Sequence, residues 1–237
     1  MYILSAPPFL DSFIQADWLG KAIYLCLFST SVICWVLLIQ KALLTRSLHQ
    51  QAMQFTSVFQ KHKKNPLSFD LPINTGNPFH KIYSVLKRQT LELLNKNRHF
   101  AKDTTQPVTL SPTDIDFIES HVSSSIIEEV HNMEKNLYIL STIVTLAPFL
   151  GLLGTVWGIL VSFSDLQGGV QSQMVLGGLS LALTTTVLGL IIAIPALIGN
   201  NYLRNAIKVI QNDMESFSND VMASVELQYR QVDAKHQ

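Results

Sequence analysis

Two stretches of sequence decide the fold: APFLGLLGTVWG at residues 147–158 and GLSLALTTTVLGLIIAIP at residues 178–195. The segment 136–203 that contains them carries a single charged residue, Asp165. On each side of Asp165 the apolar run exceeds the roughly 20 residues that an α-helix needs to cross a bilayer. A transmembrane helix that only contacts lipid does not need glycines and threonines at helical spacing. The sequence therefore predicts a membrane hairpin whose helices pack against other helices and line something.

The composition is too apolar for an ordinary soluble domain. Of the 237 residues, 48% are hydrophobic and 14% are charged, and the apolar residues are concentrated in blocks. The net charge is zero, so no basic character points to nucleic acid as a partner. Cys26 and Cys34 lie about 12 Å apart along a helix, which is too far for a disulfide. Because no catalytic motif and no metal-ligand spacing is present, we expect no enzyme activity, cofactor or metal site.

The distribution of Lys and Arg predicts the orientation, because these residues are enriched in cytoplasmic loops. None precedes Lys21 and none lies between the second and third spans, whereas several follow the first span and flank the other ends of the hairpin. We therefore expect an all-α membrane protein with three transmembrane helices that continue into a cytoplasmic helical bundle. Its expected parts are an outward-facing N-terminus (1–21), a first span (22–44), a cytoplasmic insertion (45–136), a second span (137–163), a periplasmic loop (164–174), a third span (175–203) and a cytoplasmic C-terminal helix (204–237).

Turn and cap signals divide the cytoplasmic insertion into helices. The first span is expected to continue as a helix until Asn65-Pro66 ends it. Asn77-Pro78 then has the form of an N-cap followed by a first helical proline, and opens a helix that ends near His99. Residues 111–114, SPTD, resemble a capping box. Since no helix breaker follows before Pro148, we expect one helix to run from this box directly into the second span.

The C-terminal part carries an amphipathic pattern that extends the third span. Apolar residues recur there at intervals of three or four, which is the spacing of one helix face. These residues are Ile207, Ile210, Met214, Phe217, Val221 and Val225.

Small residues form a seam along each helix of the hairpin. They recur at intervals of three or four in both spans, and such seams let another helix approach closely. The residues expected to pack helices together are Pro148, Gly151, Gly154, Gly158, Gly178, Ala182 and Gly189.

The hydroxyl groups of the hairpin allow two interpretations. Ser141, Thr155 and Ser162 recur with Pro148 every seven residues, and Thr186 lies on the third span. Either they donate back to carbonyl groups of their own helix, or they line a polar path that passes protons or coordinates an ion without a buried charge. Both interpretations predict an oligomer, because a three-span chain with seams on two helices needs partners for them.

The hairpin resembles that of the ExbB/TolQ/MotA family of proton-channel subunits. The resemblance is strongest at residues 147–158 and at residues 185–196, TTVLGLIIAIPA, which stand in the right order and separation. Residues 34–41, CWVLLIQK, look more like TolQ than MotA, and three spans also disfavour MotA, which has four. The chain is therefore most similar to the TolQ and ExbB members of the family.

The resemblance implies a homopentamer in the bacterial inner membrane, with a periplasmic N-terminus and a cytoplasmic C-terminus. The pentamer would enclose the transmembrane helices of an ExbD/TolR-like partner, and proton flow would power envelope work or biopolymer transport. The pathway threonines of the family map onto Thr155 and Thr186. Envelope maintenance and nutrient uptake both remain open, as do protons and sodium as the ion.

The sequence departs from the family pattern at one position. ExbB and TolQ usually carry a glutamate in the third span, where residues 178–183 of this chain, GLSLAL, place Leu181. Because no other acid lies within any span, we expect a carboxylate of the partner to carry the proton past Thr155 and Thr186. The alternative is a non-conducting membrane scaffold that keeps the family fold.

Overall fold

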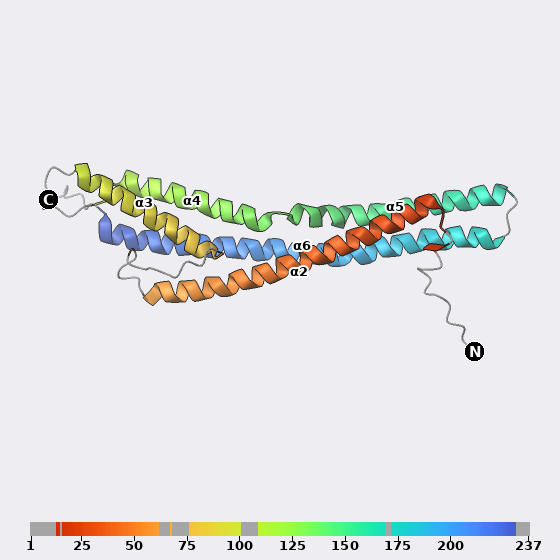
Figure 1. Ribbon diagram of the computed structural model, residues 1–237, viewed down its shortest axis with the longest axis horizontal. Coiled ribbons are helices and arrows are strands. Elements are labelled where there is room, and N and C mark those ends of the chain that lie inside the picture. Colours follow the sequence, from red (N-terminus) through yellow and green to blue (C-terminus); the bar gives the residue numbers. More distant parts are fainter. Residues whose placement is uncertain are drawn as a thin grey trace, which may run out of the picture. The chain divides into compact units, whose positions relative to one another are not determined.

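The computed structural model describes residues 13–14, 16–61, 67, 76–100, 109–168 and 172–230. Within these residues the chain forms five long helices (Figure 1). They are α2 (Trp18–Lys61), α3 (Pro78–Phe100), α4 (Pro112–Glu134), α5 (Leu137–Gln167) and α6 (Ser172–Tyr229). Helices α2, α5 and α6 are long and apolar enough to cross a membrane. The described part contains no strand and a single isolated β-bridge, between Leu110 and Arg230, so the predicted all-α class is confirmed.

The chain divides into two compact units, and α2 and α6 contribute residues to both. The membrane unit comprises residues 1–42 and 136–203, and the insertion unit comprises residues 43–135 and 204–237. Helix α2 ends at Lys61, whereas its expected stop at Asn65-Pro66 lies outside the described residues.

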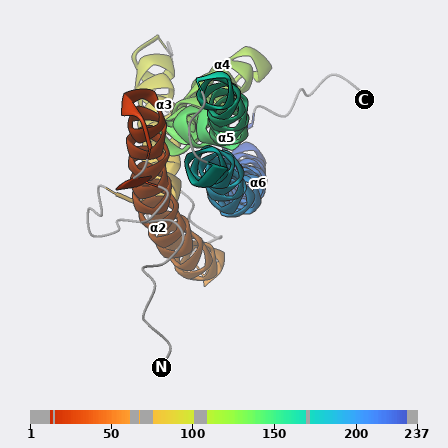
Figure 2. The same cartoon turned by 90° about the vertical axis from the view of Figure 1, so that its right-hand side faces the viewer.

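In the membrane unit, α5 and α6 run antiparallel as neighbours, with the first part of α2 beside them (Figures 1 and 2). Small residues occupy the inside of the hairpin, and Ala147 and Ala196 are fully buried. Large apolar side chains point outward, as in Phe149, which is 67% exposed, and Leu160, which is 58% exposed. This distribution is the reverse of a water-soluble core, and it requires lipid or other subunits around the hairpin.

The prediction of one helix from the capping box into the second span is wrong. Helix α4 ends at Glu134, and Lys135 and Asn136 form a turn before α5 begins at Leu137. Asn136 has the left-handed conformation, with φ 72° and ψ −3°. Asparagine adopts this conformation more readily than most residues because its short polar side chain bonds locally. An asparagine in a polar stretch therefore ends the helix without a glycine or a proline.

Aromatic rings fill the core of the insertion unit. The ring of Phe217 on α6 lies 5.3 Å from the rings of Phe55 and Phe59 on α2, and 5.8 Å from that of Phe79 on α3, in edge-to-face geometry. All six apolar residues of the predicted C-terminal stripe are buried. The predicted amphipathic continuation of the third span is therefore confirmed.

The expected caps begin two helices of the insertion unit. The side-chain oxygen of Asn77 accepts a hydrogen bond from the backbone N–H of Phe79, at 3.0 Å. The N–H of Asp114 donates to the hydroxyl of Ser111 at 3.2 Å, and the N–H of Ser111 donates to the carboxylate of Asp114 at 3.0 Å. This reciprocal pair is the capping box that the sequence predicts.

Candidate functional site

The two small-residue seams meet face to face in the hairpin. A Cβ atom added to Gly151 would lie 2.9 Å from the Cα atom of Thr186. On the other helix, a Cβ atom added to Gly189 would lie 2.6 Å from the carbonyl oxygen of Ala147. A real side chain would clash with the facing backbone at both places, so α5 and α6 reach this separation only with glycine at these positions.

The remaining residues of the α5 seam face side chains of α6. A Cβ atom on Gly154 would overlap the side chain of Thr185, and one on Gly158 would lie 2.9 Å from the Cβ atom of Ala182. Pro148 is half-buried within α5, and the helix continues through it. Glycine and alanine residues therefore allow α5 and α6 to pack closely along several turns.

The two threonines expected in the path differ in their hydrogen bonds. The hydroxyl of Thr186 donates across the hairpin to the carbonyl of Gly151 at 3.0 Å. The hydroxyl of Thr155 donates to the carbonyl of Leu152 on its own helix at 2.7 Å. Since Thr155 lies four residues beyond Gly151, the two hydroxyls sit within about 6 Å of each other along the axis of α5. Both side chains are half-buried, so each keeps a part exposed at the surface of the hairpin.

Two other hydroxyls lie inside the hairpin interface. Thr185 is fully buried and donates to the carbonyl of Ala182 at 2.8 Å. Ser162 is also buried, and its hydroxyl lies 2.8 Å from the carbonyl oxygen of Gly158 and 3.2 Å from that of Val175. Their bonds to helix carbonyls satisfy these hydroxyls locally, as the packing interpretation expects. Thr185 could not be distinguished from its neighbours in the sequence, because its burial depends on the facing Gly154 of α5.

Leu181, at the position of the acid that the resemblance implies, faces the first helix of the same chain. It is 6% exposed and forms an apolar cluster with the buried residues Ala16 and Tyr24. Phe13 and Leu188 pack against this cluster as partly buried residues. A carboxylate at position 181 would therefore lie next to the N-terminal end of α2.

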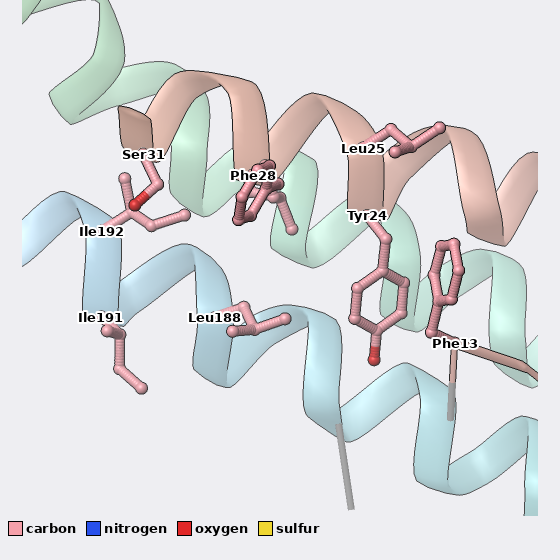
Figure 3. A pocket seen from close by; sticks show the side chains of 9 residues that line it. Phe13, Tyr24, Leu25, Phe28, Ser31, Leu188, Ile191 and Ile192 are labelled. Atoms are coloured by element: carbon pink, nitrogen blue, oxygen red, sulfur yellow. The ribbon is translucent and has the colours of Figure 1, made fainter. Parts of the chain in front are cut away.

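An apolar pocket of about 380 Å³ continues from this cluster between α2 and α6 (Figure 3). The rings of Phe13 and Tyr24 meet edge to face at one end, with centroids 5.8 Å apart, and Ser31 lies at the other end. The lining residues are Phe13, Tyr24, Leu25, Leu27, Phe28, Ser31, Leu188, Ile191 and Ile192. Hydrocarbon dominates this lining, and no charged side chain contributes to it.

Asp17, in the segment that the sequence analysis placed outside the membrane, bonds to the second span. Its Oδ2 atom accepts a hydrogen bond from the indole Nε1–H of Trp157 at 2.8 Å, and its Oδ1 atom accepts one from the N–H of Gly20 at 2.9 Å. The bond from Gly20 caps the start of α2. An acid just before a helix is a readable signal for this cap. The contact with Trp157 joins residues 140 positions apart, and nothing in the sequence indicates it.

Clearly shifted pKa values occur at polar contacts of the insertion unit. Hydrogen bonds to Glu129 at 2.7 Å and to Glu128 at 3.0 Å raise the pKa of Lys81. Burial by itself would raise the pKa of Asp114, but hydrogen bonds from the capping box and from Asn97 outweigh it and lower that pKa. These groups tie α3 to α4 and cap α4, so their role is structural.

Comparison with known proteins places the hairpin in a family. The sequence profile of the MotA/TolQ/ExbB proton channel family matches residues 82–216. The chain is 27% identical over 218 residues to the Tol-Pal system protein TolQ of Haemophilus influenzae. The match covers 88% of this chain and 90% of that protein. It is 23% identical over 202 residues to the biopolymer transport protein ExbB of Neisseria meningitidis serogroup B, and the match covers 84% of this chain and 88% of that protein. It is also 51% identical over 74 residues to the biopolymer transport protein ExbB of Helicobacter pylori strain J99, and the match covers 30% of this chain and 51% of that protein.

These matches agree with the resemblance carried by the hairpin residues. The profile spans more than half of the chain and includes all of α4 and α5 together with parts of α3 and α6. The relatives are named as Tol-Pal and biopolymer transport proteins, and none of these names describes an enzyme. The chain therefore belongs to the MotA/TolQ/ExbB proton channel family.

Proposed function

We propose that the chain is the channel-wall subunit of an inner-membrane motor that couples the proton motive force to envelope work or biopolymer transport. The observation that carries this proposal is the hairpin seam, which brings the Thr186 hydroxyl onto the Gly151 carbonyl with Thr155 one turn away. The TolQ and ExbB relatives support it, since their names describe the Tol-Pal system and biopolymer transport.

The proposed assembly is a homopentamer around the single-span helices of an ExbD/TolR-like partner. The outer face of α5 supports an assembly of this kind, because Phe149, Val156 and Leu160 are each more than half exposed. Apolar side chains at this density need lipid or neighbouring helices around them. The N-terminus would be periplasmic and the C-terminus cytoplasmic, as the Lys and Arg distribution indicates.

In the proposed mechanism, protons move past the two pathway threonines. A hydroxyl group both donates and accepts hydrogen bonds, so Thr155 and Thr186 can hold a proton-bearing group or a water chain at the surface of the hairpin. A carboxylate of the partner would carry the proton, since Leu181 has no titratable group. One charge crossing 100 mV releases about 2.3 kcal/mol, which is enough to bias a movement of the partner.

The second candidate function is a non-conducting membrane scaffold. The observation that favours it is the apolar cluster around Leu181, which places hydrocarbon where the family resemblance implies an ionisable side chain. A scaffold would keep the seams and the oligomer while it loses ion flux.

Reconstitution in liposomes separates the two candidates. The chain is incorporated together with its ExbD/TolR-like partner, a potassium diffusion potential is imposed, and proton flux is followed with a pH-sensitive dye. We expect flux that falls at least about tenfold when the membrane aspartate of the partner is changed to Asn. Vesicles that contain the chain alone are the control. Equal flux with both partners would contradict the mechanism, and no flux with either would favour the scaffold.

A further inference from the structure

Asp17 lies beside Leu181, the position at which the family resemblance implies an acid. We propose that Asp17 is the proton-binding group that this chain contributes to the path, in place of an acid at position 181. The inference rests on the proposed function, because a proton-binding group matters only if the assembly conducts protons. Three observations support it: the distance from Asp17 to Leu181, the depth of Asp17 in the hairpin, and the bonds that hold its carboxylate.

The side chains of Asp17 and Leu181 both approach the space beside the Cα atom of Gly20. A Cβ atom added to Gly20 would lie 2.9 Å from Oδ1 of Asp17 and 3.1 Å from Cδ2 of Leu181. Oδ1 of Asp17 and Cδ2 of Leu181 are therefore no farther apart than the sum of these two distances. Leu181 approaches this volume from α6, and Asp17 approaches it from the start of α2. A carboxylate on either residue would thus lie close to Gly20, in the same region of the membrane unit.

The carboxylate lies well inside the outer ends of the hairpin. Its partner Trp157 is ten residues from Gln167, the end of α5, and Leu181 is nine residues from Ser172, the start of α6. Each separation corresponds to about 14–15 Å along a helix. Figure 1 shows that α2 begins short of the neighbouring ends of α5 and α6. The predicted second span ends at Phe163 and the third begins at Val175, each six residues, or about 9 Å, from Trp157 and Leu181. With these span ends at the edge of a hydrocarbon core about 30 Å thick, Asp17 lies inside the apolar slab, where ionisable residues mark ion pathways.

The surroundings of Asp17 leave positions at which a proton can bind. Lys21 and Tyr24 lie on the next two turns of α2, and α5 and α6 present Trp157 and Leu181. Each carboxylate oxygen offers two lone pairs and accepts one hydrogen bond, so each retains acceptor capacity. A hydronium ion from the outer side gives up one proton here and becomes water, while the carboxylate becomes a carboxylic acid. The proton then leaves to the carboxylate of the partner, and Asp17 returns to its starting state.

The competing explanation is that Asp17 serves only to cap α2 and to fasten it to α5. The two explanations differ in what the Trp157→Phe substitution does. This substitution breaks the bond between the helices and keeps the carboxylate, whereas Asp17→Asn removes the titratable group. A fastening role predicts equal losses from the two variants. A proton-binding role predicts a much larger loss from Asp17→Asn.

Proton flux in liposomes that contain the chain and its ExbD/TolR-like partner tests the assignment. We expect Asp17→Asn to lower flux at least about tenfold, and Trp157→Phe to lower it by no more than about threefold. Adding Leu181→Glu to Asp17→Asn should restore at least about a third of the wild-type flux, because it returns a carboxylate to the same volume. Asp165→Asn is the matched control at the outer end of α5 and should leave flux unchanged. Oligomer size in detergent, measured for every variant, identifies any that fail to assemble.

Several results would overturn the assignment. They are wild-type flux in Asp17→Asn, an equal loss in Trp157→Phe, or no recovery in a double variant that assembles normally. Absence of flux from the wild-type complex would instead overturn the proposed function on which the inference rests.

Discussion

The hairpin seam of the membrane unit and the aromatic core of the insertion unit are built on opposite principles. In the seam, Gly151 and Gly189 bring helices together because no side chain stands between their backbones. In the insertion unit, helices are held apart and joined by the large rings around Phe217. Lipid gives no hydrophobic reward for burying apolar side chains, so membrane helices associate through close backbone packing and interhelical hydrogen bonds. In water the burial of apolar side chains is favourable, and the buried rings of the insertion unit form a core of that kind.

This difference means that the two units fail in opposite ways. Removing volume should damage the insertion unit, and adding volume should damage the hairpin. Substitutions that remove or add side-chain volume in the full-length protein test that contrast.

The largest effect is expected from Phe217→Ala in the insertion unit. The substitution removes a ring that contacts three other aromatic rings, and a cavity of this kind costs about 3–5 kcal/mol. Thermal unfolding of the full-length protein in detergent should show a strongly lowered midpoint. Leu227→Ala, on the same helix at a residue that is 91% exposed, is the matched control. A midpoint equal to that of the control would contradict the aromatic core.

A smaller but functionally severe effect is expected from Gly151→Val in the hairpin. The added side chain meets the Cα atom of Thr186, and overpacking of this kind costs about 1–3 kcal/mol. Oligomer size in detergent should shift toward smaller species or aggregates. Leu153→Val changes an exposed apolar residue of the same helix and should leave the oligomer intact. Normal assembly of Gly151→Val would show that the helices do not need backbone contact.

Loss of one hydrogen bond across the hairpin should have a moderate effect. Thr186→Val keeps the shape of the side chain and removes the donor to the Gly151 carbonyl, which costs about 1 kcal/mol. The midpoint of thermal unfolding should fall by a few degrees. Thr145→Val is the control, because the exposed hydroxyl of Thr145 donates to the carbonyl of Thr142 on its own helix at 2.9 Å. If both variants unfold at the same temperature, the cross-helix bond contributes nothing specific.

The smallest effect is a pH dependence at the cap of α4. The pKa of Asp114 is lower in the folded protein than its ordinary value, so its contribution to stability is present above an unfolded pKa of about 3.9 and is lost as the pH falls through the folded pKa. The stability difference between wild type and Asp114→Asn should therefore shrink between about pH 5 and pH 3. Asp116→Asn, at an exposed position of the same helix, serves as the control. A difference that is constant with pH would contradict the capping role of the carboxylate.

Local signals made much of the fold predictable. Residues that are close together in the sequence determine each of three features: the cap at Asn77, the capping box at Ser111 and the apolar stripe of the C-terminal helix. Such features depend on neighbouring residues, so their chemistry can be recognised without the rest of the chain. The helix break at Asn136 escaped prediction because asparagine only tolerates the left-handed conformation, and the flanking packing decides whether it is used.

The candidate site was predictable only in part. The periodicity of small residues indicated where α5 and α6 have closely packing faces, but not which glycine of one helix meets which residue of the other. The bond between Asp17 and Trp157 was out of reach, because it depends on where the start of α2 lies against the hairpin. Whether Thr155 and Thr186 line a path depends on copies of the chain and on a partner, so their assignment stays a prediction.

Proton flux through complexes that carry Thr155→Val measures whether the hairpin forms the wall of a proton path. Valine keeps the branched shape of threonine and removes the hydroxyl, so packing of α5 is preserved while the proposed path loses a polar group. Thr142→Val is the matched control on the same helix, since the exposed hydroxyl of Thr142 donates to the carbonyl of Tyr138. We expect Thr155→Val to lower proton flux at least about tenfold and Thr142→Val to leave it near the wild-type value. Wild-type flux in Thr155→Val would contradict a channel wall formed by the hairpin.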